Sequence, residues 1–251
     1  MRRIGDSFRS GLVGIAALAL VQCSPGQRPA AETENGVRAG VRAEAVAPAP
    51  ARAGESATLA AFADGGVSIP RVSGIEAGAA RRIEAAIEGE RERYRRWNGE
   101  CRRLAAEAEM EGAVEVEAIA AYNAHGLLSL RLEGLAYCGG ANGTPIYDAM
   151  TFDLRSGERI DVAALTGLSG EQLAALARPF YPAGECSEPL GLAGGAEFKT
   201  AYLDRGGLAI LYSFGGGASE GCSLTPAIVP VEQARARTRI DERLPRAWGG
   251  R

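Results

Sequence analysis

The residues of this sequence that could carry chemistry are one histidine, five cysteines and many carboxylates. Most zinc sites and most Ser/His or Cys/His catalytic pairs need histidine, so any such chemistry would have to pass through His125. His125 lies in a turn-like sequence at positions 123–126, between two strand-like segments, and we expect it to be a solvated turn residue. The carboxylates are so numerous that their spacing selects no glycosidase-like pair.

Other nucleotide-binding and catalytic motifs are missing. The glycine-rich sequence Gly215-Gly216-Gly217-Ala218 lacks the Gly-Lys-Ser/Thr ending of a phosphate-binding loop, and the sequence contains no Gly-x-Ser-x-Gly nucleophile elbow. The net charge of -3 argues against a general nucleic-acid surface, which would need a basic excess. We therefore expect no enzymatic activity, no metal, no cofactor and no nucleic-acid partner.

The first 23 residues are organised like a secretory signal. Three arginines and an apolar segment at positions 11–21 begin the chain, and this segment is shorter than the about 20 residues of a membrane-spanning helix. It leads into Leu20-Val21-Gln22-Cys23, which resembles the lipobox at which bacterial lipoproteins are cleaved and lipidated, although Gln22 stands where a small residue is usual. We expect a lipid on Cys23. The alternative is a plain signal peptide cleaved a few residues further on.

The segment after Cys23 bears on location and domain boundaries. Ser24 resembles the sorting pattern of outer-membrane lipoproteins, so we favour the periplasmic side of the outer membrane, and a soluble periplasmic protein is the alternative. Residues 24–55 are rich in Ala, Pro, Gly, Arg and Glu without periodic order, which is typical of a disordered tether. We assign residues 56–240 to a single domain and residues 241–251 to a C-terminal tail.

The cysteine count agrees with export. If Cys23 carries a lipid, four cysteines remain, an even number that suits an oxidising compartment. We prefer the pairs Cys101–Cys138 and Cys186–Cys222, each of which closes a loop of about 35 residues. A disulfide that closes a loop of this length stabilises a fold by about 3 to 4 kcal/mol. Binding of zinc by four thiolates is the weaker alternative, because no CxxC pair exists.

The periodicity of the folded part predicts an α+β fold. Apolar residues recur at helical spacing over residues 76–97, which predicts one long amphipathic helix near the N-terminus. Alternating patterns and turn sequences predict neighbouring strands of an antiparallel sheet, and a second short helix is expected near residues 170–178. The strands are expected at residues 113–122, 127–137, 146–153, 159–162, 197–203, 208–214 and 227–231, with a short edge segment at 67–70.

The most distinctive sequence is Tyr137-Cys138-Gly139-Gly140-Ala141-Asn142. Two adjacent glycines let a backbone pass close to another strand or to a ligand, and a tight loop or bulge is the plainer interpretation. Candidate ligand-binding residues are therefore those of this loop and the aromatic residue of the following strand: Tyr137, Gly139, Gly140, Asn142 and Tyr147.

This loop and the sequences around it resemble a known family. Gly-Gly-Ala, an aromatic strand and the later Phe152-Asp153-Leu154-Arg155-Ser156-Gly157 are similar to the extracytoplasmic domain of unknown function in RsiV-type anti-sigma factors and PdaC-type peptidoglycan deacetylases. The resemblance covers about residues 67 to 235. This sequence has Asn142 where the family usually has histidine, so a proton-linked or metal role at that position is not expected.

The resemblance implies an isolated sensing or binding module. We accordingly expect a non-catalytic exported module of the bacterial cell envelope, whose ligand is a cell-wall glycan or an exported protein such as a muramidase. One alternative is a carboxylate-dependent hydrolase acting on envelope polymers, which would need a deep cleft holding two facing Asp or Glu residues. Another is a structural or assembly lipoprotein, which would show a large exposed apolar patch.

Overall fold

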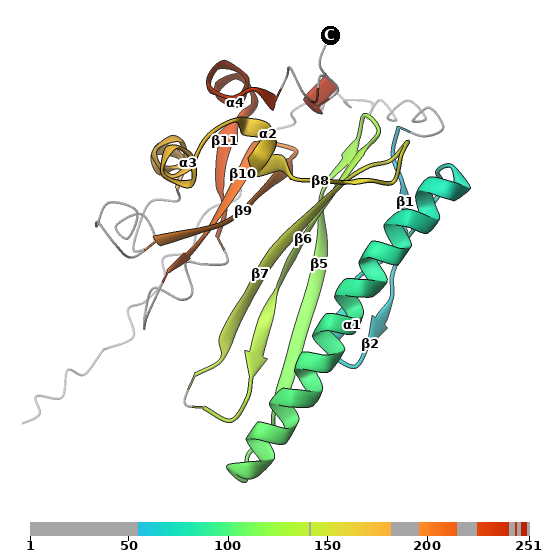
Figure 1. Cartoon of the computed structure of the whole chain (residues 1–251), viewed down its shortest axis with the longest axis vertical. Coiled ribbons are helices and arrows are strands. Elements are labelled where there is room, and N and C mark those ends of the chain that lie inside the picture. Colours follow the sequence, from blue (N-terminus) through green and yellow to red (C-terminus); the bar gives the residue numbers. More distant parts are fainter. Residues whose placement is uncertain are drawn as a thin grey trace, which may run out of the picture. The chain divides into compact units, whose positions relative to one another are not determined.

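The structure is a computed structural model that describes residues 55–140, 142–181, 196–214, 225–240, 244 and 247–249 (Figure 1). The signal segment, the expected lipidation site Cys23 and the tether lie outside these residues, and so do Cys186 and Cys222. Within the described part, no helix is both long enough and apolar enough to cross a membrane. The fold belongs to the α+β class, as predicted, with one long helix, short helices and mixed or antiparallel sheets.

The long helix α1 runs from Ala77 to Glu107 and is ten residues longer at its C-terminal end than the sequence pattern predicts. It begins at Glu76, whose carboxylate accepts hydrogen bonds from the backbone N–H groups of Gly78 and Ala79 and so satisfies donors that have no partner within the helix. One stripe of the helix is buried along its whole length: Ala79, Ile83, Ile87, Arg91, Tyr94, Asn98, Cys101 and Ala105. Because Cys101 and Ala105 are buried, the helix continues to pack on the fold beyond residue 97.

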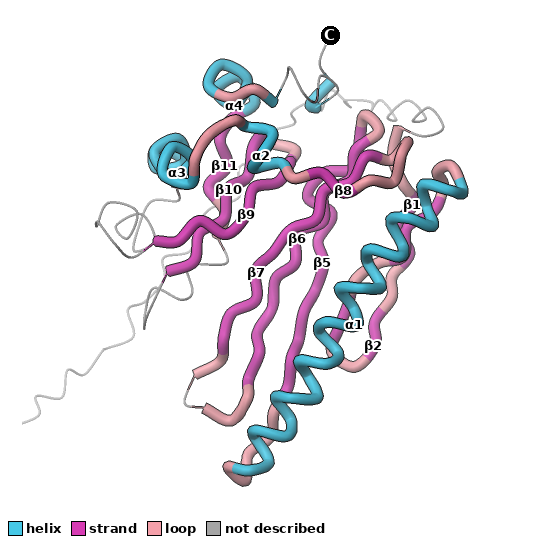
Figure 2. Tube along the Cα trace, in the orientation of Figure 1, coloured by secondary structure: helices cyan, strands magenta, loops and turns pink. Residues whose placement is uncertain are grey.

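The main sheet has six strands in the order β2-β3-β5-β6-β7-β8. Its three long strands β5, β6 and β7 lie side by side in Figure 2. The bounds of the six strands are Ala63–Asp64, Val67–Ser68, Ala113–Ala124, Leu127–Tyr137, Thr144–Asp153 and Arg159–Ile160. All neighbours are antiparallel except β3 and β5, which are parallel. This corrects the expectation of one antiparallel sheet. The chain leaves β3, passes through α1 and enters β5, and a helical crossover of this kind joins parallel strands.

Two further sheets complete the strand structure. Strands β1 (Thr58–Ala60) and β4 (Arg71–Ser73) form an antiparallel pair, and β11 (Ala227–Pro230), β10 (Gly207–Phe214) and β9 (Ala196–Asp204) form a three-stranded antiparallel sheet. Short helices follow or precede these strands: α2 (Val162–Thr166), α3 (Gly170–Ala177) and α4 (Val231–Arg237). Helix α3, expected near residues 170–178, has Ser169 as its N-cap in a capping box with Gln172. Helices α2 and α4 were not expected.

The apolar core has two large parts. One lies between α1 and the main sheet and contains Ile83, Ile87, Leu130 and Leu132, all essentially inaccessible to solvent. The other involves the three-stranded sheet and the short helices. Leu244 and Ala247 pack into this second part although they belong to the segment that the sequence analysis treats as a tail. Their burial follows from tertiary contacts, because an isolated Leu and Ala among charged residues give no periodic pattern.

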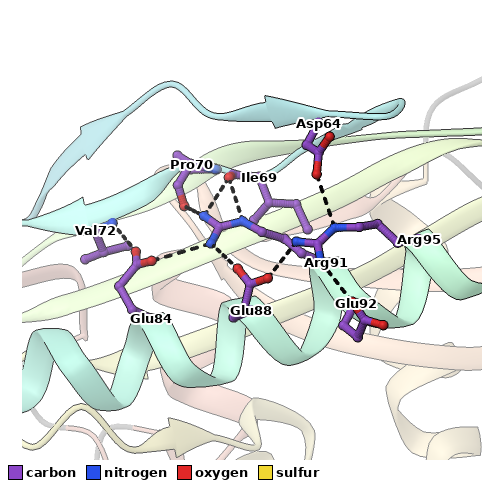
Figure 3. A network of polar contacts seen from close by, with 9 residues as sticks. All are labelled: Asp64, Ile69, Pro70, Val72, Glu84, Glu88, Arg91, Glu92 and Arg95. Atoms are coloured by element: carbon purple, nitrogen blue, oxygen red, sulfur yellow. Dashed lines mark hydrogen bonds and ion pairs between the residues drawn. The ribbon is translucent and has the colours of Figure 1, made fainter.

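A buried arginine attaches the N-terminal strands to α1 (Figure 3). Arg91 is 2% exposed, and its Nη2 donates to the carbonyl oxygens of Ile69 and Pro70 at 2.9 Å each. Its Nη1 donates to Glu88 at 3.0 Å and to Glu84 at 3.5 Å. A buried guanidinium is tolerated only when it is paired and hydrogen-bonded, and here both conditions are met.

The same network extends along the helix. Arg95 contacts Glu88 at 2.6 Å, Glu92 at 2.8 Å and, from strand β2, Asp64 at 3.4 Å (Figure 3). The buried amide of Asn98 donates to the carbonyl oxygen of Gly65 and accepts from the N–H of Val114. These contacts hold β2 and β3 beside β5. Residues of β2, β3 and the turn between them line the groove described next.

Candidate functional site

The face of the main sheet that points away from α1 carries a row of polar residues across four strands. Ser68 on β3 is paired with Glu117 on β5, Glu117 with Glu133 on β6, and Glu133 with Tyr147 on β7. Side chains of directly paired residues lie on the same face of a sheet, about 4.5 to 5.5 Å apart at Cβ. The register therefore brings two carboxylates, a hydroxyl and a phenol into one line.

This face contains an open groove of about 640 Å³, which we call the acidic groove. Its carboxylates come from Glu115, Glu117 and Glu133, and the rest of its lining is small or apolar: Ala63, Gly66, Ser68, Val116, Gly134 and Leu135. Leu135 is 49% exposed and so adds accessible apolar surface to the groove. The groove therefore combines negative charge with an accessible apolar surface.

The carboxylates of the acidic groove are only partly neutralised by the described residues. Glu133 pairs with Arg131 at 2.8 Å, whereas no described cation pairs with the exposed Glu115 or Glu117. Like charges directly opposite each other on neighbouring strands destabilise a fold, and because only Glu133 of this facing pair has an ion-pair partner among the described residues, the negative charge of Glu117 stays uncompensated. The groove thus carries negative charge that the described residues do not neutralise.

Two glycines of the groove lining allow neighbouring strands to approach each other closely. A Cβ at Gly134 would collide with the backbone carbonyl oxygen of Glu115 and would lie 2.8 Å from Cα of Val116, so no side chain fits between β5 and β6 at this point. Gly66, at the turn between β2 and β3, has a positive φ of 89°, and its carbonyl oxygen accepts from the N–H of Val116. These two positions let β3, β5 and β6 lie close together at the groove.

The three-stranded sheet contacts the main sheet at Tyr147, the residue opposite Glu133. The hydroxyl of Tyr147 donates to Ser213 Oγ on β10 at 2.5 Å, and Tyr147 packs on the small cluster that includes Ala149, Tyr202 and Leu211. Burial raises the pKa of Tyr202, and the neighbouring Arg131 guanidinium acts in the opposite direction. Arg131 therefore serves both the groove carboxylate Glu133 and the buried tyrosine.

The structure places the five predicted ligand-binding residues along one end of this face without gathering them into a single pocket. Tyr147 stands at the border of the acidic groove, opposite Glu133. Tyr137 ends β6, four residues further along the strand, and lines a separate shallow pocket with Arg102, Met110 and Glu111. Its hydroxyl points to the Met110 sulfur at 3.9 Å. Tyr137 and Tyr147 thus share a face, about 13 Å apart along the strand.

The glycine loop between β6 and β7 has a structural explanation. Gly139 has a φ of 89°, and a Cβ on it would lie 2.8 Å from Cα of Ala105 in α1. It therefore provides the close approach of the loop to the helix that the plainer interpretation of this motif implies. Gly140 and Asn142 are exposed beside it, and Ala141 lies outside the described residues.

A disulfide between Cys101 and Cys138 joins the last turns of α1 to this loop. It is one of the two pairs that the sequence analysis prefers, and both cysteines of the other pair lie outside the described residues. A structural disulfide is typical of proteins in an oxidising, extracytoplasmic compartment.

The groove carboxylates were not singled out by sequence reasoning. The alternating pattern already places Glu115 and Glu117 on the polar face of one strand and Glu133 on the polar face of the next, and this was the available signal. The direct pairing of Glu117 with Glu133 depends on a bulge at Ala121, where the register between β5 and β6 shifts. That bulge has no sequence signature such as glycine.

Other chemistry-bearing residues are isolated. His125 is exposed in the turn between β5 and β6, with a positive φ of 53° and its ring 6.5 Å from that of Tyr122. Over the described ranges, no group of three or more His, Cys, Asp or Glu is arranged to hold a metal ion.

Comparison with known proteins shows a weak structural similarity. No protein-family model matches the sequence, and no curated protein matches it. A DUF3298 family protein from Pseudomonas aeruginosa PAO1 aligns with 15% identity and a TM-score of 0.39 over 56% of this chain and 66% of that chain. A member of the same family from Bacteroides fragilis NCTC 9343 aligns with 17% identity and a TM-score of 0.40 over 62% and 69%. The chain thus spans about two thirds of each and is structurally similar, at low identity, to DUF3298 family proteins.

Proposed function

We propose that this domain is a non-catalytic binding module of the bacterial cell envelope, exported and held by a lipid on Cys23, and that the acidic groove docks a basic exported protein such as a muramidase. The observation that carries the proposal is the pair of exposed glutamates, Glu115 and Glu117, which lack a cationic partner among the described residues. A cationic partner would neutralise them and relieve the repulsion between Glu117 and Glu133.

The lining of the acidic groove favours a protein ligand over a glycan. Sites for small apolar or cyclic ligands are commonly lined by aromatic side chains, and the groove lining contains none. An exposed leucine between carboxylates instead suits a protein surface that presents basic side chains around an apolar contact. Opposite charges on the two surfaces also accelerate encounter, which suits a sensing role.

The test is direct binding of a basic muramidase such as lysozyme to the mature chain, measured by calorimetry at low and high salt. The double variant Glu115→Lys/Glu117→Lys should weaken binding at least about tenfold, because each attractive contact becomes repulsive. The control is Glu158→Lys/Glu171→Lys, which makes the same change of charge at exposed positions outside the groove. Equal weakening by both variants, or binding by neither the native chain nor the control, would contradict the proposal.

A second candidate function has one observation in its favour. Glu117 and Glu133 face each other across neighbouring strands, and two carboxyl groups about 5 to 5.5 Å apart are the arrangement of retaining glycosidases. The hydrolase hypothesis predicts release of reducing ends from purified peptidoglycan and loss of that release in Glu117→Gln. Absence of release by the native chain, together with binding of the muramidase, would decide for the binding module.

A further inference from the structure

A second hollow, which we call the polar cavity, lies apart from the acidic groove and shares none of its lining residues. It measures about 500 Å³ and lies between β7, β8, the start of α2 and β9. Its polar lining includes Asp148, Arg159, Asp161, Lys199 and Thr200, and its aromatic wall is Phe198. A volume of this size suits a small ligand.

The charges of the polar cavity balance. Two residues with carboxylates, Asp148 and Asp161, and two with cationic side chains, Arg159 and Lys199, belong to its lining. A site for phosphate or another anion would carry an excess of positive charge, and a site for a cation would carry an excess of negative charge. A balanced lining offers hydrogen-bond donors and acceptors without selecting a charged ligand.

The charged groups on one side of the polar cavity are held in place by α1. Arg93 contacts Asp148 at 3.1 Å and Glu90 at 2.6 Å, and Glu90 contacts Arg159 at 3.3 Å. Arg159 also donates to the carbonyl oxygen of Ala149 at 3.2 Å. Because Asp148 and Arg159 are fixed by these neighbours, their remaining hydrogen-bonding capacity is oriented before a ligand arrives.

The other side of the polar cavity is formed by β9 and the N-cap of α2. Phe198 is half-buried, and its ring stands edge-on to that of Tyr212 at 6.0 Å, so it presents a fixed apolar surface. Asp161 accepts a hydrogen bond from the N–H of Ala164 and caps α2. Lys199 is the only lysine of the chain, which otherwise uses arginine for its cationic side chains.

We propose that the polar cavity binds a neutral, polyhydroxylated ligand of one or two sugar rings. Each hydroxyl of a sugar both donates and accepts hydrogen bonds, so it needs carboxylates and cations together, and the apolar face of a sugar ring can lie on an aromatic side chain. The balanced charge, Thr200 and Phe198 belong to the lining that could supply these contacts, although the register places Thr200 opposite Leu211 and Phe198 opposite Tyr212, on different faces of β9. The acidic groove offers carboxylates but no aromatic surface, so the two sites differ in ligand class.

The single lysine makes the proposal measurable. Lys199 of the mature full-length chain is labelled with an amine-reactive reagent in the presence and absence of diacetylchitobiose, a neutral sugar of two rings, and its modification is followed by mass spectrometry. Bound sugar should slow labelling of Lys199 at least about threefold at a concentration of several times Kd. An unchanged rate at about 10 mM sugar, where even ligands with Kd of about 1 mM are mostly bound, would overturn the proposal.

Variants locate the effect in the polar cavity. Thr200→Val removes one hydroxyl at nearly constant volume, and Asp161→Asn removes one charge while asparagine keeps the helix cap. Each should weaken sugar binding at least about fivefold, whereas Thr144→Val, an exposed threonine near the other end of β7, should leave it unchanged. Equal affinity of all three variants would count against the cavity, and so would tighter binding of glucosamine 6-phosphate than of the neutral sugar.

The sugar experiment is separable from the test of the acidic groove. Glu115→Lys/Glu117→Lys should bind the sugar like the native chain, and Thr200→Val should bind the muramidase like the native chain, because the two linings have no residue in common. Loss of sugar binding in the groove variant would place the sugar in the acidic groove and contradict the assignment to the polar cavity.

Discussion

The two faces of the main sheet both carry charge, and they treat it differently. On the face toward α1, Arg91 is almost fully buried, and it is surrounded by two carboxylates and two backbone carbonyl oxygens. On the opposite face, Glu115 and Glu117 are exposed without a described cation beside them. A charge that is paired and hydrogen-bonded within the fold has a structural role, whereas a charge without such partners at an open surface indicates a binding partner.

The largest expected effect on stability comes from removing the buried arginine on the face toward α1. Arg91→Ala removes the donor to Glu84, Glu88 and two carbonyl oxygens, so we expect a loss of about 3 to 5 kcal/mol in the free energy of unfolding, measured by urea denaturation. The control is Arg96→Ala, whose side chain is 66% exposed and has a single contact of 3.9 Å, and it should change stability by less than about 0.5 kcal/mol. Similar losses in the two variants would show that Arg91 is not the attachment point.

The disulfide gives the next effect, at the end of the same face. Cys101→Ala/Cys138→Ala releases a loop closed over 37 residues, and the chain-entropy model predicts a loss of about 3 to 4 kcal/mol. Muramidase binding measured below the unfolding transition should be retained, because the groove lining includes neither cysteine. A variant as stable as the native chain would mean that this loop is already ordered when the chain is unfolded.

In the acidic groove, removal of a charge should raise the stability of the fold instead of lowering it. Glu117→Gln removes one of two facing carboxylates, so we expect the free energy of unfolding to rise by about 0.2 to 1 kcal/mol while muramidase binding weakens. Urea denaturation and calorimetry on the same preparation measure both quantities. Glu92→Gln is the matched control, because its carboxylate pairs with Arg95 and its removal should not stabilise the fold. A destabilised Glu117→Gln would show that this carboxylate has a structural partner.

The smallest effect is the acid dependence of the ion pairs on α1. Hydrogen bonds from Arg95 and then Arg91 lower the pKa of Glu88 below its ordinary value of 4.5. A carboxylate with a lowered pKa in the folded state stabilises the fold fully above its ordinary value and loses this contribution as pH falls through its lowered one. The side chain of Glu88 is 51% exposed, so solvent screens its ion pairs and weakens them. Between pH 5 and pH 3, the melting temperature of the native chain should therefore fall only slightly more steeply than that of Glu88→Gln, as measured by thermal denaturation. Identical profiles would contradict the pairing.

Much of the fold could be predicted because local patterns decide it. The alternation of residues 127–137 matched the bounds of β6, and the short helix expected near residues 170–178 corresponds to α3. Helix α1 was placed correctly at its start, but its last ten residues were missed because Cys101 and Ala105 are small and give a weak apolar signal. The family resemblance rested on the Gly-Gly-Ala loop, the aromatic strand after it and residues 152–157.

What the sequence determined by itself was the class of the fold, the order of its main elements and the polar character of one strand face. Only the tertiary structure decided which carboxylates meet. Counted from the turn at His125 without a bulge, Glu117 would stand opposite Gly134, and the shift between Ala120 and Tyr122 places it opposite Glu133 instead. The physical reason is that register is set by backbone hydrogen bonds and by packing of both sheet faces at once, and neither quantity is local in the sequence.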